Sequence, residues 1–169
     1  MKIMFISDIH GSAYYMEKIV EIFNNENYQH LYILGDVLYH GPRNDLPLEY
    51  NPKRVIELLK MIKKKITYIR GNCDAEVDEM VLKCKMSKNK TITLDGKKVF
   101  LTHGHHYNKD NLPNKQFDIM MYGHFHIPFI ISNNSHIIMS PGSISIPKEN
   151  SLPSYIKYED KEFEIVTIF

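Results

Sequence analysis

Five short segments of the sequence carry residue types that bind divalent metal ions, and each follows an apolar run. The segments are Asp8-Ile9-His10, Gly35-Asp36, Gly71-Asn72-Cys73-Asp74, Thr102-His103-Gly104-His105-His106 and Gly123-His124-Phe125-His126. Their expected metal ligands are Asp8, His10, Asp36, Asn72, His103, His124 and His126. Imidazole combined with carboxylate suits manganese, iron, zinc or nickel, whereas an all-oxygen set would indicate magnesium or calcium.

No single segment is a specific signal, because Gly-Asp or Gly-Asn after a strand is more often a turn. Their joint occurrence, each time directly after an expected strand, favours one shared metal site. In an extended chain, residues two apart point to the same side, about 6.5 Å from each other. Asp8 and His10 are therefore expected to reach one cavity, and so are His124 and His126.

The same residue types favour two ions rather than one. Two ions about 3.5–4 Å apart are the arrangement used for in-line displacement at phosphorus. Cations at that separation repel each other, so they need a bridging anion, and the carboxylate of Asp36 can give one oxygen to each. Asn72 adds a neutral oxygen ligand. The residues therefore predict a two-metal centre that cleaves phosphate esters.

The first half of the chain shows the elements that would position these residues. Apolar runs predict strands at 2–7, 30–34 and 66–69. Ser12 is expected to cap one helix, and Asn51 to cap a second that begins at Pro52. A third, short helix is expected at 75–82. Strand–helix–strand order predicts parallel pairing, with a ligand site at the carboxyl ends of the strands.

The second half is richer in strands. Asp95-Gly96 lies between two β-like runs, which predicts a hairpin with strands at 91–94 and 98–102. Further strands are expected at 118–122, 136–140, 154–158 and 162–169. These strands are expected to be mostly antiparallel. The predicted fold class is α/β, a four-layer α-β-β-α sandwich of two mixed sheets flanked by helices.

Composition narrows the class of protein. The 169 residues suit a single domain spanning 1–169. A formal net charge of +1 gives no reason to expect nucleic acid or a membrane as partner. The basic cluster Lys63-Lys64-Lys65 is expected to close a helix. Cys73 and Cys84 give no disulfide framework, no apolar run reaches a membrane-spanning length, and the first residues are unlike a signal peptide, so a cytoplasmic location is expected.

In this order, the five segments resemble the signature of the calcineurin-like metallophosphoesterases. Longer stretches are similar to the bacterial YfcE-type phosphodiesterases: Ser7–Gly11, Leu34–Leu38, His40–Asn44, Arg70–Asp74 and Pro141-Gly142-Ser143. The likeness runs from Met1 to about Pro147 and continues more faintly to the end. It implies the metallophosphoesterase fold and a metal-dependent phosphoric diester hydrolase. The implied substrates are small phosphodiesters, and the implied cofactors are two divalent ions, manganese first and nickel, zinc or iron after it.

The resemblance also implies how the ligands are divided. One ion would be held by Asp8, His10, Asp36 and His126, and the other by Asp36, Asn72, His103 and His124. A hydroxide bridging the ions would be the nucleophile, because metal binding lowers the pKa of water from about 15.7 to about 7. The residues implied in catalysis are Asp36, Asn72, Cys73 and Asp74, with Asn72 stabilising charge on the phosphoryl oxygens.

Cys73 departs from the common superfamily pattern, in which a histidine at this position helps to protonate the leaving oxygen and an acidic residue orients it. An unperturbed thiol has a pKa of about 8.5 and is a weak hydrogen-bond donor. The YfcE-type subgroup shares this cysteine. A preference for esters with good leaving groups, such as aryl phosphodiesters, is therefore expected.

Three further residues are candidates for contacts with the substrate. Arg43 can grip a phosphate oxygen with two hydrogen bonds, although a surface salt bridge explains a loop arginine equally well. His40 follows Asp36 closely enough to approach the substrate. His105 can line the pocket or can lie on the surface.

Two other functions remain open from the sequence. The same centre can serve a phosphomonoesterase, including a phosphoprotein phosphatase. The fold can also serve as a non-catalytic scaffold for protein contacts, as in the retromer subunit, whose metal site is altered at its histidines. The apolar segment Ile127–Ile131 fits either a core strand or the interface of a homodimer or higher homo-oligomer.

Overall fold

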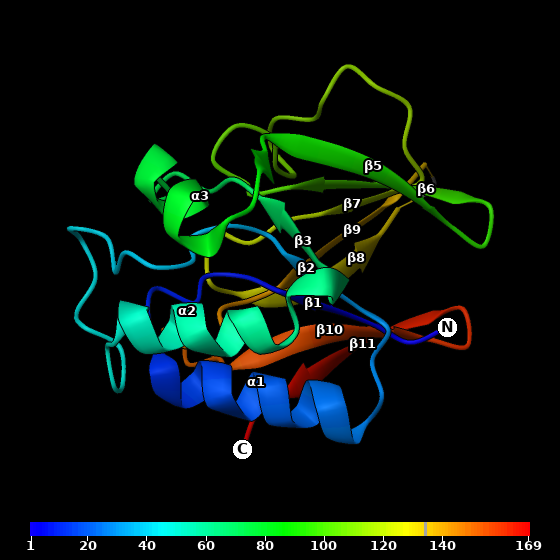
Figure 1. Ribbon diagram of the computed structural model, residues 1–169. Helices are drawn as coiled ribbons and strands as arrows, with labels where there is room; N and C mark the ends of the chain where they lie inside the picture. The colour runs from blue at the N-terminus through cyan, green and yellow to red at the C-terminus, as the bar shows by residue number, and fades with distance from the viewer. Residues whose placement is uncertain (134) are drawn as a thin grey trace.

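The computed structural model describes residues 1–133 and 135–169, and its strands form two sheets (Figure 1). The first sheet contains β1 (Ile3–Ile6), β2 (His30–Ile33), β3 (Ile66–Ile69), β4 (Met86–Ser87), β10 (Ser154–Glu159) and β11 (Glu162–Thr167). The second contains β5 (Asn89–Leu94), β6 (Lys97–Thr102), β7 (Ile119–Met121), β8 (Pro128–Ser132) and β9 (Ile137–Pro141). The strand orders are β11-β10-β1-β2-β3-β4 and β5-β6-β7-β9-β8.

The helices are α1 (Ala13–Asn25), α2 (Pro52–Met61) and α3 (Glu76–Leu82). The Ser12 side chain accepts a hydrogen bond from the Tyr15 N–H, and Asn51 caps α2 in the same way, so both predicted caps are confirmed. The three lysines from Lys63 form a separate 3-10 turn rather than the end of α2, because α2 stops at Met61. Within the described residues, no helix is both long and apolar enough to cross a membrane.

Strands β1, β2, β3 and β4 are parallel neighbours, as expected for the first half. Helices α1 and α2 cover the outer face of this sheet (Figure 1). Side chains alternate along β1: Met4 and Ile6 face the helices, whereas Ile3 and Phe5 face the second sheet. All four side chains are buried, two on each face of the sheet. Because both faces are covered, β1 is a continuous apolar run in the sequence.

The expectation that the strands of the second half are mostly antiparallel is wrong for the centre of the second sheet, where the strands are parallel. β6 pairs with β7 and β7 with β9 in parallel, and only the outer pairs β5–β6 and β8–β9 are antiparallel. The long segment 103–118 between β6 and β7 lets the chain return to the same edge of the sheet. As a result, the carboxyl ends of β6 and β7 lie together, which places two of the histidine segments side by side.

The expected fold class, two mixed sheets with helices, is confirmed. The two sheets face each other through one apolar cluster that includes Phe5, Leu101 and Met139. One layer differs from the expectation. In the described residues, the outer face of the second sheet is covered by Tyr107 and Phe117 of the 103–118 segment, and the helices lie elsewhere.

Candidate metal centre

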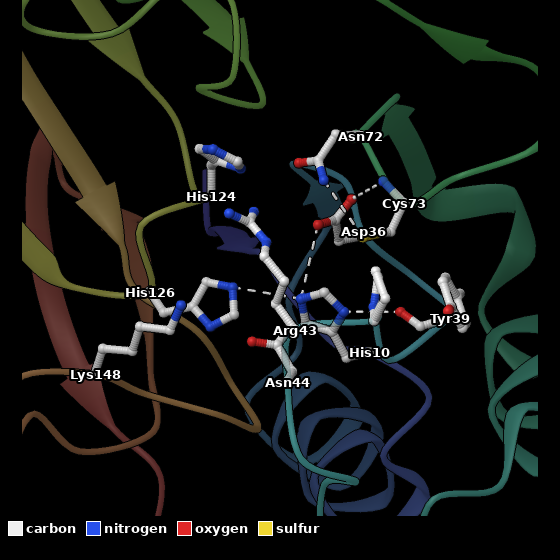
Figure 2. Close-up of a pocket in the computed structure, with 12 residues that line it drawn as sticks. His10, Asp36, Tyr39, Arg43, Asn44, Asn72, Cys73, His124, His126 and Lys148 are labelled. Atoms are coloured by element: carbon white, nitrogen blue, oxygen red, sulfur yellow. Dashed lines mark hydrogen bonds and ion pairs between the residues drawn. The ribbon is translucent and has the colours of Figure 1, made fainter.

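The ends of five strands meet at the edge where the two sheets face each other. The seven predicted ligands follow these strands: Asp8 and His10 after β1, Asp36 after β2, Asn72 after β3, His103 after β6, and His124 and His126 after β7. Figure 2 shows five of them, with the rings and carboxylate directed toward a common space. Asn72 is exposed and His124 half-buried, and the other five are buried.

One group of ligand atoms is formed by Asp8, His10 and His126. The Asp8 Oδ1 atom lies 3.7 Å from His10 Nε2 and 3.3 Å from His126 Nε2. The two Nε2 atoms are 3.4 Å apart. These atoms surround a point at which a cation could bind all three side chains.

A second group is formed around His103. Its Nε2 atom lies 3.3 Å from Asp36 Oδ2 and 3.0 Å from Asn72 Oδ1. The same Asp36 oxygen is 3.7 Å from His10 Nε2, in the first group. Asp36 Oδ2 therefore lies between the two groups, where a bridging carboxylate would have to be.

The ring orientation of three histidines determines which ring nitrogen is free to bind a metal ion. Each ring places Nδ1 against a backbone carbonyl, which can only accept a hydrogen bond, so Nδ1 carries a proton. The pairs are His10 with Tyr39 at 2.8 Å, His103 with Leu34 at 2.6 Å and His126 with Ile146 at 2.8 Å. In the neutral rings the Nε2 lone pairs then point at each other and at carboxylate oxygens. Such a set of facing acceptors fits a metal ion, and the carbonyl contacts are typical of ligating histidines.

Electrostatics and burial support the same fit. Burial alone would raise the pKa of the Asp8 carboxyl, but His10 and His126 hold that pKa well below its usual value. Burial lowers the pKa of His103, yet the facing carboxylates of Asp36 and Asp8 raise it to about 9. Asp8 Oδ1 is buried and accepts no hydrogen bond from the described residues. A buried oxygen without a donor is costly unless a cation neutralises it.

The backbone at the strand ends is turned, not extended. Five of the seven ligands have φ values between 47° and 66°: Asp8, His10, Asp36, His124 and His126. This left-handed region is sparsely populated by residues other than glycine and is found at functional sites. Asp8 and His10 do reach one cavity, as expected, but the reason is this turned backbone and not the alternation of an extended strand.

Glycines allow the turned strand ends to come this close. A Cβ atom on Gly123 would overlap Ser7 and Asp8 side-chain atoms, and one on Gly71 would overlap Asp36. At Gly35, whose φ is 105°, a Cβ would lie 2.6 Å from His103 Nδ1. The glycines that precede Asp36, Asn72 and His124 therefore make room for a neighbouring predicted ligand.

His124 is the least enclosed of the histidine ligands. Its ring centroid lies 5.2 Å from that of His103, and its backbone N–H donates to Asp8 Oδ2 at 2.9 Å. Burial lowers the pKa of His124, which keeps the ring neutral and able to bind a metal ion. Among the described residues, His124 belongs to none of the groups of His, Cys, Asp and Glu atoms that lie within 4.8 Å of one another.

Asp74 lies behind the ligands and holds two strand ends together. Its carboxylate accepts three backbone hydrogen bonds, from Asp36 at 2.8 Å, Val37 at 2.8 Å and Gly71 at 2.7 Å. The Cys73 N–H donates to Asp36 Oδ1 at 2.8 Å, which directs the other oxygen of Asp36 into the centre. Asp74 thus positions the loops that carry Asp36 and Asn72.

A cavity of about 340 Å³ opens onto the centre. Its lining residues are His10, Asp36, Tyr39, Gly41, Pro42, Arg43, Asn44, Asn72, Cys73, His124, His126 and Lys148. In Figure 2 the Arg43 side chain extends toward His124, and Lys148 lies beside His126. Lys148 was missed in the sequence, although it is the one basic residue between β9 and β10.

The other two expected substrate residues lie outside this cavity. His40 packs between Tyr39 and Tyr50, with ring centroids 4.8 and 5.3 Å away. His105 lies against His103, at 5.3 Å between centroids, and lines a different hollow of the surface. Of the three, Arg43 alone lines the cavity over the metal ligands.

Comparison with known proteins agrees with this geometry. The chain matches the calcineurin-like phosphoesterase superfamily domain over residues 1–161 and belongs to that superfamily. Phosphodiesterase YfcE of Escherichia coli (strain K12) is 41% identical over 170 residues, which cover 99% of this chain and 92% of that protein. Phosphodiesterase MJ0936 of Methanocaldococcus jannaschii is 26% identical, with 84% of this chain and 83% of that protein covered.

Solved structures give the same result. The structure of the phosphoesterase YfcE from Escherichia coli superposes with a TM-score of 0.95 at 40% identity, covering 99% of this chain and 93% of that one. Vps29 from Entamoeba histolytica, in a structure with bound zinc, superposes with a TM-score of 0.68 at 17% identity, covering 98% and 97%. The second likeness concerns the fold alone.

Proposed function

We propose that this protein is a binuclear metal-dependent phosphodiesterase that hydrolyses small phosphodiesters. The main support is that His10, His103 and His126 use Nδ1 for backbone carbonyls and direct Nε2 toward two buried carboxylates. The name of the 41% identical relative, a phosphodiesterase, supports the reaction type. The cavity of about 340 Å³ suits a small molecule.

The ligand groups suggest the division of the two ions. The first would be held by Asp8, His10, Asp36 and His126, and the second by Asp36, Asn72, His103 and His124. When bound, the ions supply hydroxide at neutral pH and neutralise charge on the phosphoryl group. Manganese is the proposed metal, with nickel, zinc or iron as alternatives, because nitrogen and oxygen donors are mixed.

The chain's own residues bind and orient the substrate. Arg43, on the loop after β2, is placed to donate to a non-bridging phosphate oxygen above the metal ligands. The exposed amide of Asn72 adds a donor at the rim of the same cavity. Burial and the nearby Asp36 raise the pKa of the Cys73 thiol to about 12, so it keeps its proton and is a weak acid for the leaving oxygen. Diesters with good leaving groups are therefore the proposed substrates.

Hydrolysis of bis(4-nitrophenyl) phosphate tests the proposal. Protein treated with a chelator should be inactive, and added manganese, nickel or zinc should restore release of nitrophenolate. The monoester 4-nitrophenyl phosphate, tested alongside, should be cleaved at least tenfold more slowly. Faster cleavage of the monoester would instead indicate a phosphomonoesterase or phosphoprotein phosphatase. Binding of two metals without hydrolysis of either ester would indicate a protein-binding scaffold.

We also propose that two copies associate along β8 and that the protein is cytoplasmic. β8 is the edge strand of the second sheet, and Ile130 and Ile131 on it are 42% and 50% exposed. An uncharged, exposed edge strand readily pairs with another copy. Ile131→Lys should then convert a dimer to a monomer in light scattering.

The proposed cytoplasmic location is supported by the two free cysteines, which suit a reducing compartment.

A further inference from the structure

The row of parallel strand ends that carries the metal ligands continues for one more strand. β4 lies beside β3 in parallel at the edge of the six-stranded sheet, and Lys88 follows it directly. The Arg70 N–H donates to the Ser87 carbonyl at 2.9 Å, which keeps the two chain segments together beyond the strands. The edge that presents Asp36 and Asn72 therefore goes on to present two basic side chains.

These side chains line a cavity of about 370 Å³, here called the basic groove. Its residues are Arg70, Gly71, Asn72, Asp74, Lys88, His105 and His106. Asn72 also lines the cavity over the metal centre, so the two hollows meet at a metal ligand. A further cavity of about 350 Å³ shares Lys88 and His106 and continues the groove away from the centre.

The histidines connect the groove to the centre over a short distance. The ring centroid of His105 lies 5.3 Å from that of the ligand His103 and 4.1 Å from that of His106. Imidazole N–H groups donate hydrogen bonds to anions in either tautomer. A substrate whose scissile phosphate lies on the metal ions can therefore extend one of its two ester arms into the groove.

The charges in the groove favour an anion on that arm. Lys88 is exposed and has no carboxylate within 4.0 Å in the described part of the chain. Arg70 has one loose contact, 3.9 Å from Glu79, whose other oxygen accepts the Met86 N–H at 2.6 Å. The carboxylate of Asp74 is buried and already accepts three backbone N–H groups. Two cations and the imidazole donors thus remain available to a ligand.

We propose that the basic groove binds a second phosphate group of the substrate, carried on the ester arm that leads away from the metal centre. The preferred substrates would then be phosphodiesters that bear an additional phosphate, such as a nucleoside diester phosphorylated at its other hydroxyl. This inference rests on the proposed phosphodiesterase function and specifies its substrate class.

Two chromogenic diesters test the groove directly. Thymidine 5′-(4-nitrophenyl phosphate) and its 3′-phosphorylated form share one leaving group and differ only in the second phosphate. The 3′-phosphorylated form should have a kcat/KM about tenfold higher, as one or two charge-assisted hydrogen bonds would give. The advantage should shrink as salt is added, because the groove is open to solvent.

Three variants locate the contact. Lys88→Gln and Arg70→Gln should bring the ratio of the two kcat/KM values toward one. Lys97→Gln is the matched control, since Lys97 is exposed on β6 and lies outside the groove, and it should keep the wild-type ratio. A ratio that is lost in Lys148→Gln but kept in Lys88→Gln would place the second phosphate in the metal-site cavity and overturn the proposal.

Binding provides a readout that does not depend on turnover. Calorimetric titration should show that thymidine 3′,5′-bisphosphate binds about tenfold more tightly than thymidine 5′-phosphate, and that Lys88→Gln removes the difference. Equal affinities in the wild-type protein would refute the basic groove. If neither chromogenic diester is cleaved, the proposed hydrolase function fails, and this titration alone decides on the groove.

Discussion

At the scale of single residues, the ability of the centre to bind metal depends on which ring nitrogen of each histidine carries the proton. Backbone carbonyls fix the Nδ1 proton on His10, His103 and His126, so the lone pairs of Nε2 converge with the carboxylates. Without a cation, such facing acceptors repel one another unless a proton binds between them. The pKa of His103 is raised to about 9 because the carboxylates of Asp36 and Asp8 favour a positive charge on the ring. We therefore propose that the side chains are arranged for metal ions before any ion binds.

Cys73 is the residue at which proton donation can be tested. Its thiol lines the cavity, and burial with nearby carboxylates raises its pKa to about 12. Cys73→His should place a better acid there and increase kcat about tenfold for alkyl diesters, with a smaller gain for nitrophenyl esters. Steady-state kinetics with matched metal content checks this. A fall in kcat with both ions retained would contradict the assigned weakness of the thiol.

Asp74 should prove to be a positioning residue. Its two oxygens accept N–H groups from Asp36, Val37 and Gly71 at 2.7–2.8 Å. An amide in Asp74→Asn offers one accepting oxygen, so at least one N–H loses its partner, at a cost of about 1–3 kcal/mol. Urea unfolding of chelated protein measures this, with Asp45→Asn on an exposed loop as control. Unchanged stability in Asp74→Asn would show that the carboxylate does not hold the loops.

At the scale of elements, the ends of the strands position the proposed metal ligands. Parallel strands bring Asp8, Asp36 and Asn72 to one edge, and left-handed backbone turns direct the side chains of Asp8 and Asp36. Gly35, Gly71 and Gly123 leave space in which adjacent turns touch. The geometry of the centre therefore depends on close backbone approach as much as on the ligands themselves.

Gly123→Ala tests this dependence. The added methyl group would overlap Ser7 and Asp8, so the β7 end must move away from β1. We expect a loss of about 1–3 kcal/mol in unfolding free energy and weaker metal binding in calorimetry. Gly96→Ala at the hairpin tip, where a Cβ meets nothing within 4 Å, costs only its left-handed φ and should bind metal normally. Normal metal binding in Gly123→Ala would refute the packing argument.

The difference between local signals and contacts of distant residues explains what the sequence could predict. Apolar runs, the caps Ser12 and Asn51 and the Asp95-Gly96 turn are local signals, and the elements they predicted are present. All seven proposed ligands directly follow such a run, which is why the sequence alone could single them out. The parallel pairing of β6 with β7, the two-residue strand β4 and the approach of Lys148 depend on contacts between distant residues. No short window of sequence contains that information.

At the scale of the whole molecule, the two sheets share one apolar interface, to which β1 and β10 contribute from one side and β6, β7 and β9 from the other. The proposed metal ligands follow strands of both sheets. We propose that residues 1–169 form a single cooperative domain, because neither sheet could bury its inner face alone.

Calorimetry of the chelated protein tests this cooperativity. Heating should give one transition whose calorimetric and van't Hoff enthalpies agree. Far-ultraviolet circular dichroism and tyrosine fluorescence should report the same midpoint. Two separate transitions, or midpoints that differ between the probes, would show that the sheets unfold independently.

Anomalous scattering from crystals grown with manganese tests the central claim most directly. We predict two peaks per chain, about 3.5–4 Å apart, with the Asp36 carboxylate between them. His10 and His126 should contact one peak, and His103 and Asn72 the other. A single peak, or none, with these side chains in their present positions would contradict a binuclear centre.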